Sequence, residues 1–369
     1  MSKSNTLSKI GSIVLNTIAV LTLIFILLLL WTRFTTLQPE SVQPEEIVCP
    51  ADAPKLEAGQ AVKVLNWNIQ YMASRNYVFW YDIPGNKGPD TVVKEEHVHW
   101  TIQAVADVIK AEQPDVILIQ ELSEDSKNTH HVDQLAELME KLPPEYACYT
   151  DAFYWRSAFN PHPRIAGSAD MKLATISKYA ISESTRYQLP IIPGSFPEQA
   201  YNLKRAVLEV ELPVSDGTVL HTLNTHLDAF AQGHNTMEQQ IRYVHDMLGD
   251  LERQNQAWFM GGDFNLLPPG IDLNDMHPSA HHYYNQNTEI APLFEDFQSA
   301  ATQAELNGPD RARFYTHWSN NPEIESPDRT IDYIFYARSL KKLNYRVLQS
   351  EEVKQISDHL PLVAEFQLP

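Results

Sequence analysis

The residues best suited to chemistry stand in the stretch GGDFN at residues 261–265, directly after the apolar run of residues 257–260. Such a run is typical of a short buried strand, and glycines give the backbone freedom to turn at its end. Asp263 and Asn265 are two residues apart, so on extended backbone their side chains point the same way. A carboxylate and a carboxamide placed like this could hold a phosphate oxygen and orient an attacking water, although both residues are also common in turns.

Other strand-like runs also end in polar residues that are capable of catalysis. These residues are Asn66, Asn68, Glu121, Asn224, His226, Asp358 and His359, and a further strand-like run contains Asp332. A single residue of this kind is often only structural, as a turn residue or a cap. Their repetition at strand ends favours one shared site.

The residue types in this set suit metal-assisted phosphoester hydrolysis. Glu121 ends an apolar strand, where a carboxylate is costly without a cation or hydrogen bonds. With Asn68 it would offer oxygen ligands to a hard divalent ion such as Mg²⁺, unless it is merely exposed at the strand end. His359 suits proton transfer near neutral pH, with Asp332 as the carboxylate that fixes its tautomer. His226 could polarise a phosphate oxygen or protonate a leaving group.

Several other kinds of chemistry are disfavoured by the motifs. The sequence has no serine nucleophile elbow and no Cys–His signature, which argues against acyl transfer. It has no P-loop and no G-x-G-x-x-G fingerprint. With two cysteines, Cys49 and Cys148, a thiolate zinc site is excluded, and one disulfide is possible if the domain lies outside the cytosol.

The net charge bears on the partners. The 369 residues carry 28 Lys and Arg against 47 Asp and Glu, a formal charge of −19. A field of this sign repels nucleic acid unless a local basic patch offsets it, and we find no such cluster in the sequence. Nucleic acid is therefore the less expected partner, and the oligomeric state stays open.

Residues 12–31 form an uncharged apolar run that is long enough to cross a bilayer as a helix. Lys3 and Lys9 precede it, and acidic residues follow soon after Arg33, so the positive-inside rule favours a cytoplasmic N-terminus with the remainder outside, periplasmic or extracellular. We interpret the run as a signal anchor rather than a cleaved signal peptide, because no small-x-small cleavage site follows.

Four parts are predicted along the chain. They are a short cytoplasmic segment at residues 1–11, the membrane span at 12–31, a flexible tether at 32–59 and a catalytic domain at 60–369. In the domain we expect strands at residues 62–69, 116–121, 146–149, 173–176, 206–212, 219–224, 257–260, 330–336 and 362–366. Helical spacing of apolar residues predicts helices at 93–112, 132–141 and 237–251. Such a mixture indicates an α/β chain with sheets buried between helical layers.

Six short motifs, in this order, resemble the endonuclease/exonuclease/phosphatase superfamily. They are Asn66-Trp67-Asn68-Ile69, Gln120-Glu121, Asn224-Thr225-His226-Leu227, Gly262-Asp263-Phe264-Asn265, Ile331-Asp332-Tyr333-Ile334 and Ser357-Asp358-His359-Leu360-Pro361. The resemblance implies a four-layer α/β sandwich of two facing mixed β-sheets flanked by helices, preceded here by one transmembrane helix.

The resemblance also implies a role for each site residue. Mg²⁺ or Mn²⁺ would be bound mainly by Glu121 with Asn68 beside it. His359 would be the general base or the residue that polarises the phosphate, and Asp332 would orient it. Asp263 and Asn265 would hold the water and the phosphate, while Asp358 would support the metal and His359. His226 matches the second histidine of the sphingomyelinase-like and secreted-nuclease branches.

The substrate branch is the remaining question. Ser326-Pro327-Asp328-Arg329 lacks the Trp and Cys of the inositol-phosphatase motif, and an acidic, membrane-tethered chain is unlike abasic-site endonucleases. The aromatic segments at 77–81 and 153–155 could rest at a membrane interface, or could pack onto the domain. We therefore expect a phosphodiesterase acting on a phospholipid-like or membrane-proximal substrate. The alternatives are an extracytoplasmic nuclease and a catalytically inactive membrane-tethered binding module.

Overall fold

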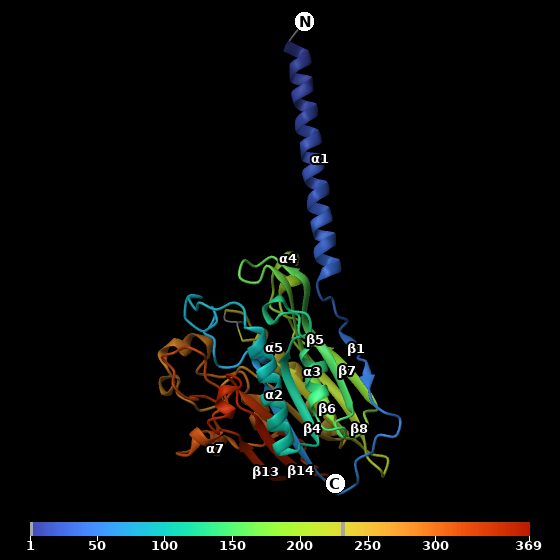
Figure 1. The fold of residues 1–369 in the computed structure, drawn as a ribbon, viewed down its shortest axis with the longest axis vertical. Coiled ribbons are helices and arrows are strands. Elements are labelled where there is room, and N and C mark those ends of the chain that lie inside the picture. Colours follow the sequence, from blue (N-terminus) through green and yellow to red (C-terminus); the bar gives the residue numbers. More distant parts are fainter. Residues whose placement is uncertain (1–2, 230–232) are drawn as a thin grey trace.

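A long N-terminal helix stands away from a body made of two facing β-sheets (Figure 1). The computed structural model describes residues 3–229 and 233–369. Helix α1 (Lys3–Thr35) contains the predicted span, and its segment Lys9–Thr35 is long and apolar enough to cross a membrane. The apolar window of this segment is not covered by the rest of the protein.

Each sheet has seven strands. The first has the order β13-β14-β3-β4-β6-β5-β2, with bounds β13 (Lys341–Val347), β14 (Leu362–Gln367), β3 (Ala61–Asn68), β4 (Val116–Leu122), β6 (Gly167–Ser177), β5 (Cys148–Asn160) and β2 (Ile47–Val48). The second has the order β1-β7-β8-β9-β10-β12-β11, with bounds β1 (Val42–Pro44), β7 (Glu183–Gln188), β8 (Ala206–Pro213), β9 (Val219–His226), β10 (Ala257–Asp263), β12 (Asp332–Tyr336) and β11 (Gln298–Ser299). Both sheets are mixed, because β3 pairs parallel with β4 and β9 pairs parallel with β10.

Helices cover the outer faces of the sheets. The longer ones are α2 (Glu95–Glu112), α3 (Gln134–Lys141) and α5 (Thr236–Arg253), and the shorter ones are α4 (Phe196–Tyr201), α6 (Ala291–Asp296) and α7 (Gln303–Leu306). Short 3-10 helices lie at Gln70–Met72, Lys127–Thr129, Leu273–Asp275, Pro278–Tyr283, Arg311–Phe314 and Val353–Gln355.

The core is divided by the alternation of side chains along the central strands. On β4, Leu118 packs in the cluster between the sheets, while Ile117 and Ile119 pack with Val98 and Ile102 of α2. Successive strand residues point to opposite faces, so a strand buried on both faces is apolar throughout. The predicted fold, a four-layer sandwich of two mixed sheets flanked by helices, is confirmed.

The predicted strands and long helices correspond to elements of the structure, but several strands were not predicted. β7 and β13 are two of them, and β5 with β6 form a hairpin far longer than expected. Residues such as Glu183 and Arg186 on β7, or Lys341 and Arg346 on β13, give no apolar run. These strands are held by backbone pairing to their neighbours instead.

The segment expected to be a flexible tether is packed onto the domain. β1 pairs with β7 at the edge of one sheet, and β2 pairs with β5 at the edge of the other. Cys49 is bonded to Cys148 at the start of β5, which settles the pairing left open by the sequence. Its prolines and glutamates favoured flexibility, but an edge strand tolerates Pro44 and exposed charge.

Candidate active site

Four parallel-paired strands bring their carboxyl ends to the same edge of the sandwich. β3 ends at Asn68 and β4 carries Glu121 just before its last residue, while β9 and β10 end at His226 and Asp263. The Asn68 side-chain amide donates to Glu121 Oε1 at 3.2 Å and to Asp263 Oδ2 at 3.0 Å. The structure therefore joins the predicted residues of both sheets in one cluster.

A buried amide network beneath this cluster fixes the two sheets relative to each other. Gln120 Nε2 donates to Asn66 Oδ1 at 2.9 Å and to Asn224 Oδ1 at 2.7 Å across the sandwich. Gly261 lies against it, and a Cβ there would stand 2.8 Å from the Asn66 oxygen. Gly262 likewise would meet the Thr225 carbonyl oxygen at 2.3 Å. The glycine pair is thus needed for close approach within strand β10, rather than for a turn.

Glu121 is aimed into the site by an irregular backbone. Its φ is +64°, in the left-handed region that costs a non-glycine residue of the order of 1 kcal/mol or more. The β4–β6 register shifts at the same point, between Ile119 and Leu122. Such a bulge redirects a side chain. About 18% of the Glu121 side chain is exposed, so a ligand can reach it from solvent.

His359 lies between two carboxylates. Its Nδ1 is 2.9 Å from Asp332 Oδ2, and its Nε2 is 3.6 Å from Asp263 Oδ2. Thr316 donates to Asp332 at 2.6 Å and so holds the orienting carboxylate in place. Burial lowers the pKa of His359, but Asp332 and Asp263 outweigh it and raise the pKa to about 10. Without another cation nearby, His359 is therefore an imidazolium at neutral pH.

Two carboxyl groups of the site are difficult to ionise. Burial, followed by the charge of Asp358, raises the pKa of Glu121 to about 7. Burial also raises the pKa of Asp263 to about 7, with Asp332 adding to the effect and His359 opposing it. Concentrated, partly desolvated carboxylates of this kind are stabilised by a bound cation, and their oxygens are ligands that Mg²⁺ prefers. The donor set therefore fits a hard divalent ion.

His226 is buried and neutral. Burial, then the nearby cations Arg205 and His359, hold its pKa well below the usual value. Its Nε2 is 3.3 Å from Asp263 Oδ2, and its Nδ1 is 3.3 Å from the Tyr154 hydroxyl. This arrangement favours Nε2–H donating to Asp263 while Tyr154 donates to Nδ1.

The remaining predicted residues line the same cluster. Asn265 donates its backbone N–H to Asp263 Oδ1 at 2.9 Å and its side-chain amide to the Leu227 carbonyl at 3.1 Å. Asp358 accepts a hydrogen bond from Gln70 Nε2 at 3.0 Å. All eight predicted site residues are therefore brought together.

Sequence reasoning missed several neighbours of these residues. Gln70, Tyr154 and Thr316 contact Asp358, His226 and Asp332 as described, and His317 stacks near His359 with ring centroids 4.3 Å apart. His317 Nδ1–H donates to the Asp358 carbonyl at 3.0 Å. Its place after Thr316 in an irregular segment gave no signal, whereas Tyr154 stood in an aromatic run for which a membrane interface and packing onto the domain were both open.

Two trios of side chains in the described residues have ligand atoms within 4.8 Å of one another: His317, Asp358 and His359, and Asp263, Asp332 and His359. Glu121 belongs to neither trio. In both trios, however, His359 is held as an imidazolium, and a protonated imidazole does not ligate a cation. The Glu121 side of Asp263 is therefore the better place for an ion.

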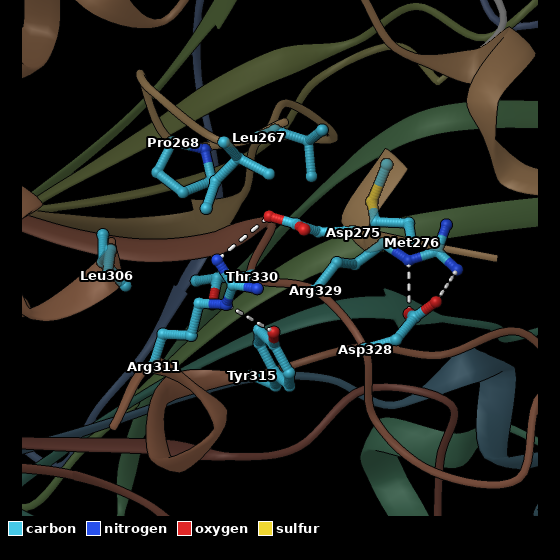
Figure 2. Close-up of a pocket in the computed structure, with 11 residues that line it drawn as sticks. Leu267, Pro268, Asp275, Met276, Leu306, Arg311, Tyr315, Asp328, Arg329 and Thr330 are labelled. Atoms are coloured by element: carbon cyan, nitrogen blue, oxygen red, sulfur yellow. Dashed lines mark hydrogen bonds and ion pairs between the residues drawn. The ribbon is translucent and has the colours of Figure 1, made fainter. Parts of the chain in front are cut away.

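A separate pocket lies beside the segment that leads into β12 (Figure 2). Arg311 pairs with Asp275 at 3.0 Å and bonds the Tyr315 hydroxyl, and Arg329 forms two bonds to Asp328 (Figure 2). Both arginines of the pocket are thus occupied by partners within the protein. The ion pairs around the pocket hold the loop before Asp332, and the pocket is separate from the strand-end cluster.

Comparison with known proteins agrees with this geometry. The family model "Endonuclease/Exonuclease/phosphatase family" matches residues 98–359. The chain belongs to the endonuclease/exonuclease/phosphatase family. The predicted resemblance is thereby confirmed, and membership supports hydrolysis of phosphoesters with a divalent metal in general terms. Among curated protein sequences, none matches the chain significantly.

Solved structures of this family share the fold. An endonuclease/exonuclease/phosphatase from Beutenbergia cavernae has a TM-score of 0.57 at 24% identity, with 84% of this chain and 72% of that chain covered. The human Nocturnin catalytic domain has a TM-score of 0.53 at 18% identity, covering 87% and 97%. TDP2 from Caenorhabditis elegans has a TM-score of 0.52 at 17% identity, covering 84% and 75%.

Proposed function

We propose that this protein is a divalent-metal-dependent phosphodiesterase that hydrolyses its substrate with an activated water. The observation that carries the proposal is the link from Asn68 to both Glu121 and Asp263, which joins the ends of the two sheets at one acidic point. The ion would be Mg²⁺ or Mn²⁺, held by the Glu121 carboxylate, which the Asn68 side-chain amide orients through its hydrogen bond, and it would neutralise charge on the phosphate.

The other residues have roles that follow from their charges. Asp263, with a pKa near neutrality, accepts the proton of the water that it orients together with Asn265. His359 is the cation that stabilises the phosphate oxygens, since Asp332 keeps it charged. His226 donates a hydrogen bond as a neutral imidazole, and Asp358 supports His359 and the metal.

We propose that α1 anchors the enzyme in a membrane, with the N-terminus cytoplasmic and the catalytic domain outside. The bond between Cys49 and Cys148 supports an oxidising compartment. The proposed substrate is a phosphodiester on a lipid-like or other membrane-proximal molecule. The aromatic segments do not support this choice, because Tyr77, Phe79 and Tyr154 are buried in the domain. Its support comes from α1 and from the charge of −19, which disfavours a nuclease.

The activity is tested with the detergent-solubilised full chain on bis-p-nitrophenyl phosphate, with Mg²⁺ or with chelator. We expect turnover only with the metal. Glu121→Gln and His359→Ala should each reduce the rate by about 10²-fold or more, because each removes charge that acts on the reacting phosphate. Glu238→Gln and His99→Ala, at exposed positions on α5 and α2, are matched controls that should keep the wild-type rate.

Two results would contradict the proposal. Absence of metal-dependent turnover would leave a membrane-tethered binding module, and a wild-type rate in either site variant would remove the role assigned to that residue. Phospholipid in mixed detergent micelles is then compared with plasmid DNA. Faster cleavage of DNA would favour the extracytoplasmic nuclease instead.

A further inference from the structure

The base of α1 is packed directly on the domain. Thr32 and Thr36 are buried, and the Thr32 hydroxyl lies 3.4 Å from the Tyr201 hydroxyl at the end of α4. The backbone N–H of Leu37 donates to the Arg156 carbonyl on β5 at 2.8 Å. The helix thus passes straight into a segment that is bonded to the domain, and its direction fixes that of the domain.

The strand pairings say which way the domain faces. Thr36 bridges Ser157 in an antiparallel sense, so β5 runs back toward α1 while the chain leaves it. β5 is antiparallel to β6, and β6 is antiparallel to β4, so β4 and its parallel neighbour β3 also run toward α1. In the other sheet the chain continues away from α1 into β1. Successive antiparallel pairs to β7, β8 and β9 then make β9 and β10 run toward α1.

Both sheets therefore present their catalytic ends, with Glu121 and Asp263, on the side of the molecule that carries α1. The C-terminus lies on the opposite side (Figure 1), and so does the disulfide, because Cys148 is the first residue of β5, which runs toward α1. β1, β2 and the disulfide hold the entering chain along the full edge of the sandwich, so this orientation is built into the fold.

The tip of the β5–β6 hairpin lies at the height of Trp31, where α1 would enter the hydrocarbon region of a bilayer. Trp31 stands five residues before Thr36, about 7 Å along a helix. Phe159 stands two residues beyond Ser157 on β5, about 7 Å along a strand in the same direction. Phe159 and Trp31 are therefore at nearly equal heights, and α4 packs beside both elements, at the base of α1 (Figure 1).

This end of the domain exposes rings that a soluble surface would bury. The exposed fractions are 81% for Phe34, 45% for Phe159 and 42% for Phe196. Arg33 in the last turn of α1 adds a cationic side chain at this end, while Arg156 on β5 is paired with Glu124 at 3.5 Å. Exposed aromatic rings with nearby cations are typical of surfaces that contact lipid headgroups.

We propose that the β5–β6 hairpin tip and α4 form a bilayer-contact surface beside α1, so that the catalytic edge faces the membrane. The occupant of this surface is the lipid bilayer that α1 spans, since the surface is continuous with that helix. The inference requires α1 to span a bilayer but does not depend on the reaction. The bilayer contact can therefore be measured even if the proposed phosphodiesterase activity fails, and the activity can be measured even if the contact fails.

The contact is tested by depth-dependent fluorescence quenching in the full chain, reconstituted in phosphatidylcholine nanodiscs. Both native cysteines are bonded to each other, so a single introduced cysteine can be labelled alone. Phe159→Cys and Phe196→Cys receive an environment-sensitive dye, and nitroxide-headgroup lipid is the quencher. Leu343→Cys on β13, with a matched exposure of 43% and far from α1, is the negative control, and Trp31→Cys is the positive control.

We expect strong quenching at positions 31, 159 and 196, and little at position 343. Quenching at 159 and 196 that is no greater than at 343 would overturn the proposal, as would absence of quenching at 31. A far-ultraviolet circular dichroism spectrum and a melting temperature equal to those of the wild type in each labelled variant, measured in parallel, show that the domain is folded and that the result concerns orientation alone.

Discussion

At the scale of residues, the site combines four buried or half-buried carboxyl groups with a single imidazolium. Glu121, Asp263, Asp332 and Asp358 surround His359, and Asp332 and His359 form the tightest pair. Removing so many carboxylates from water is costly unless cations share the space. The excess of negative charge that opposes folding in the absence of a metal ion also favours binding of that ion at the site.

A pH dependence of metal binding follows from these groups. The pKa values of Glu121 and Asp263 are raised to about 7 in the folded protein, so both carboxyls bind protons as the pH falls below 7. Protons then compete with the ion, and Mg²⁺ affinity should fall about tenfold per pH unit for each carboxyl that must be deprotonated. Titration calorimetry between pH 8 and pH 6 measures this. An affinity that does not change over the range would mean that neither carboxyl is a ligand.

At the scale of elements, sequence predicted what depends on apolar runs. The strands that carry Asn68, Glu121, His226 and Asp263 are largely buried and contain enough apolar residues to be predicted, so their positions in the chain and the chemistry of their polar residues could be deduced. Strands at or next to the edge of a sheet, such as β13 and β7, carry charge and are held by backbone hydrogen bonds, which leave no pattern in side chains.

The partners within the site were harder to predict for the same reason. Gln70, Thr316 and His317 lie in irregular segments, and their closeness to Asp358 and Asp332 arises only from the tertiary fold. The role of the glycine pair was also misjudged, because the lack of space for a Cβ at Gly261 depends on the facing sheet.

The disulfide is predicted to stabilise the packed entry segment. Cys49 and Cys148 are 99 residues apart in sequence, so the bond restricts a large part of the unfolded chain. Cys49→Ala with Cys148→Ala should lower the free energy of unfolding by about 2–5 kcal/mol, measured by denaturant titration of the detergent-solubilised chain.

Activity serves as the control for this variant. The bond lies at the end of the sandwich opposite the catalytic edge, so hydrolysis of bis-p-nitrophenyl phosphate at low temperature should stay near the wild-type rate. A loss of less than about 1 kcal/mol would show that the backbone pairing of β1 and β2 is sufficient to hold the segment.

At the scale of the whole molecule, the orientation limits what can reach the site. Leu122 on β4 is level with Lys172, and Lys172 is level with Phe153 on β5. Phe159 stands six residues beyond Phe153, so the hairpin tip extends roughly 20 Å past the metal-binding edge. A domain resting on this tip faces the bilayer but is set back from it.

Because the site is held away from the bilayer, we expect it to prefer phosphodiesters that stand above the membrane surface. In nanodiscs, a phosphodiester carried on a lipid-linked spacer of about 20 Å should be hydrolysed faster than the phosphodiester of phosphatidylcholine in the same bilayer. In detergent micelles no bilayer plane fixes the distance of either substrate from the site, so the difference between the two hydrolysis rates should be smaller. Equal rates for both substrates in nanodiscs would mean that the domain tilts or that lipid leaves the bilayer to enter the site.

The central claim is that strand ends from both sheets form one divalent-ion centre on the Glu121 side of Asp263. Anomalous scattering from Mn²⁺ in crystals of the protein tests it most directly. We predict one strong peak within coordination distance of the Glu121 carboxylate, with Asn68 adjacent and His359 across Asp263 from the ion. A peak among His317, Asp358 and His359, or no peak near Glu121 at saturating Mn²⁺, would contradict it.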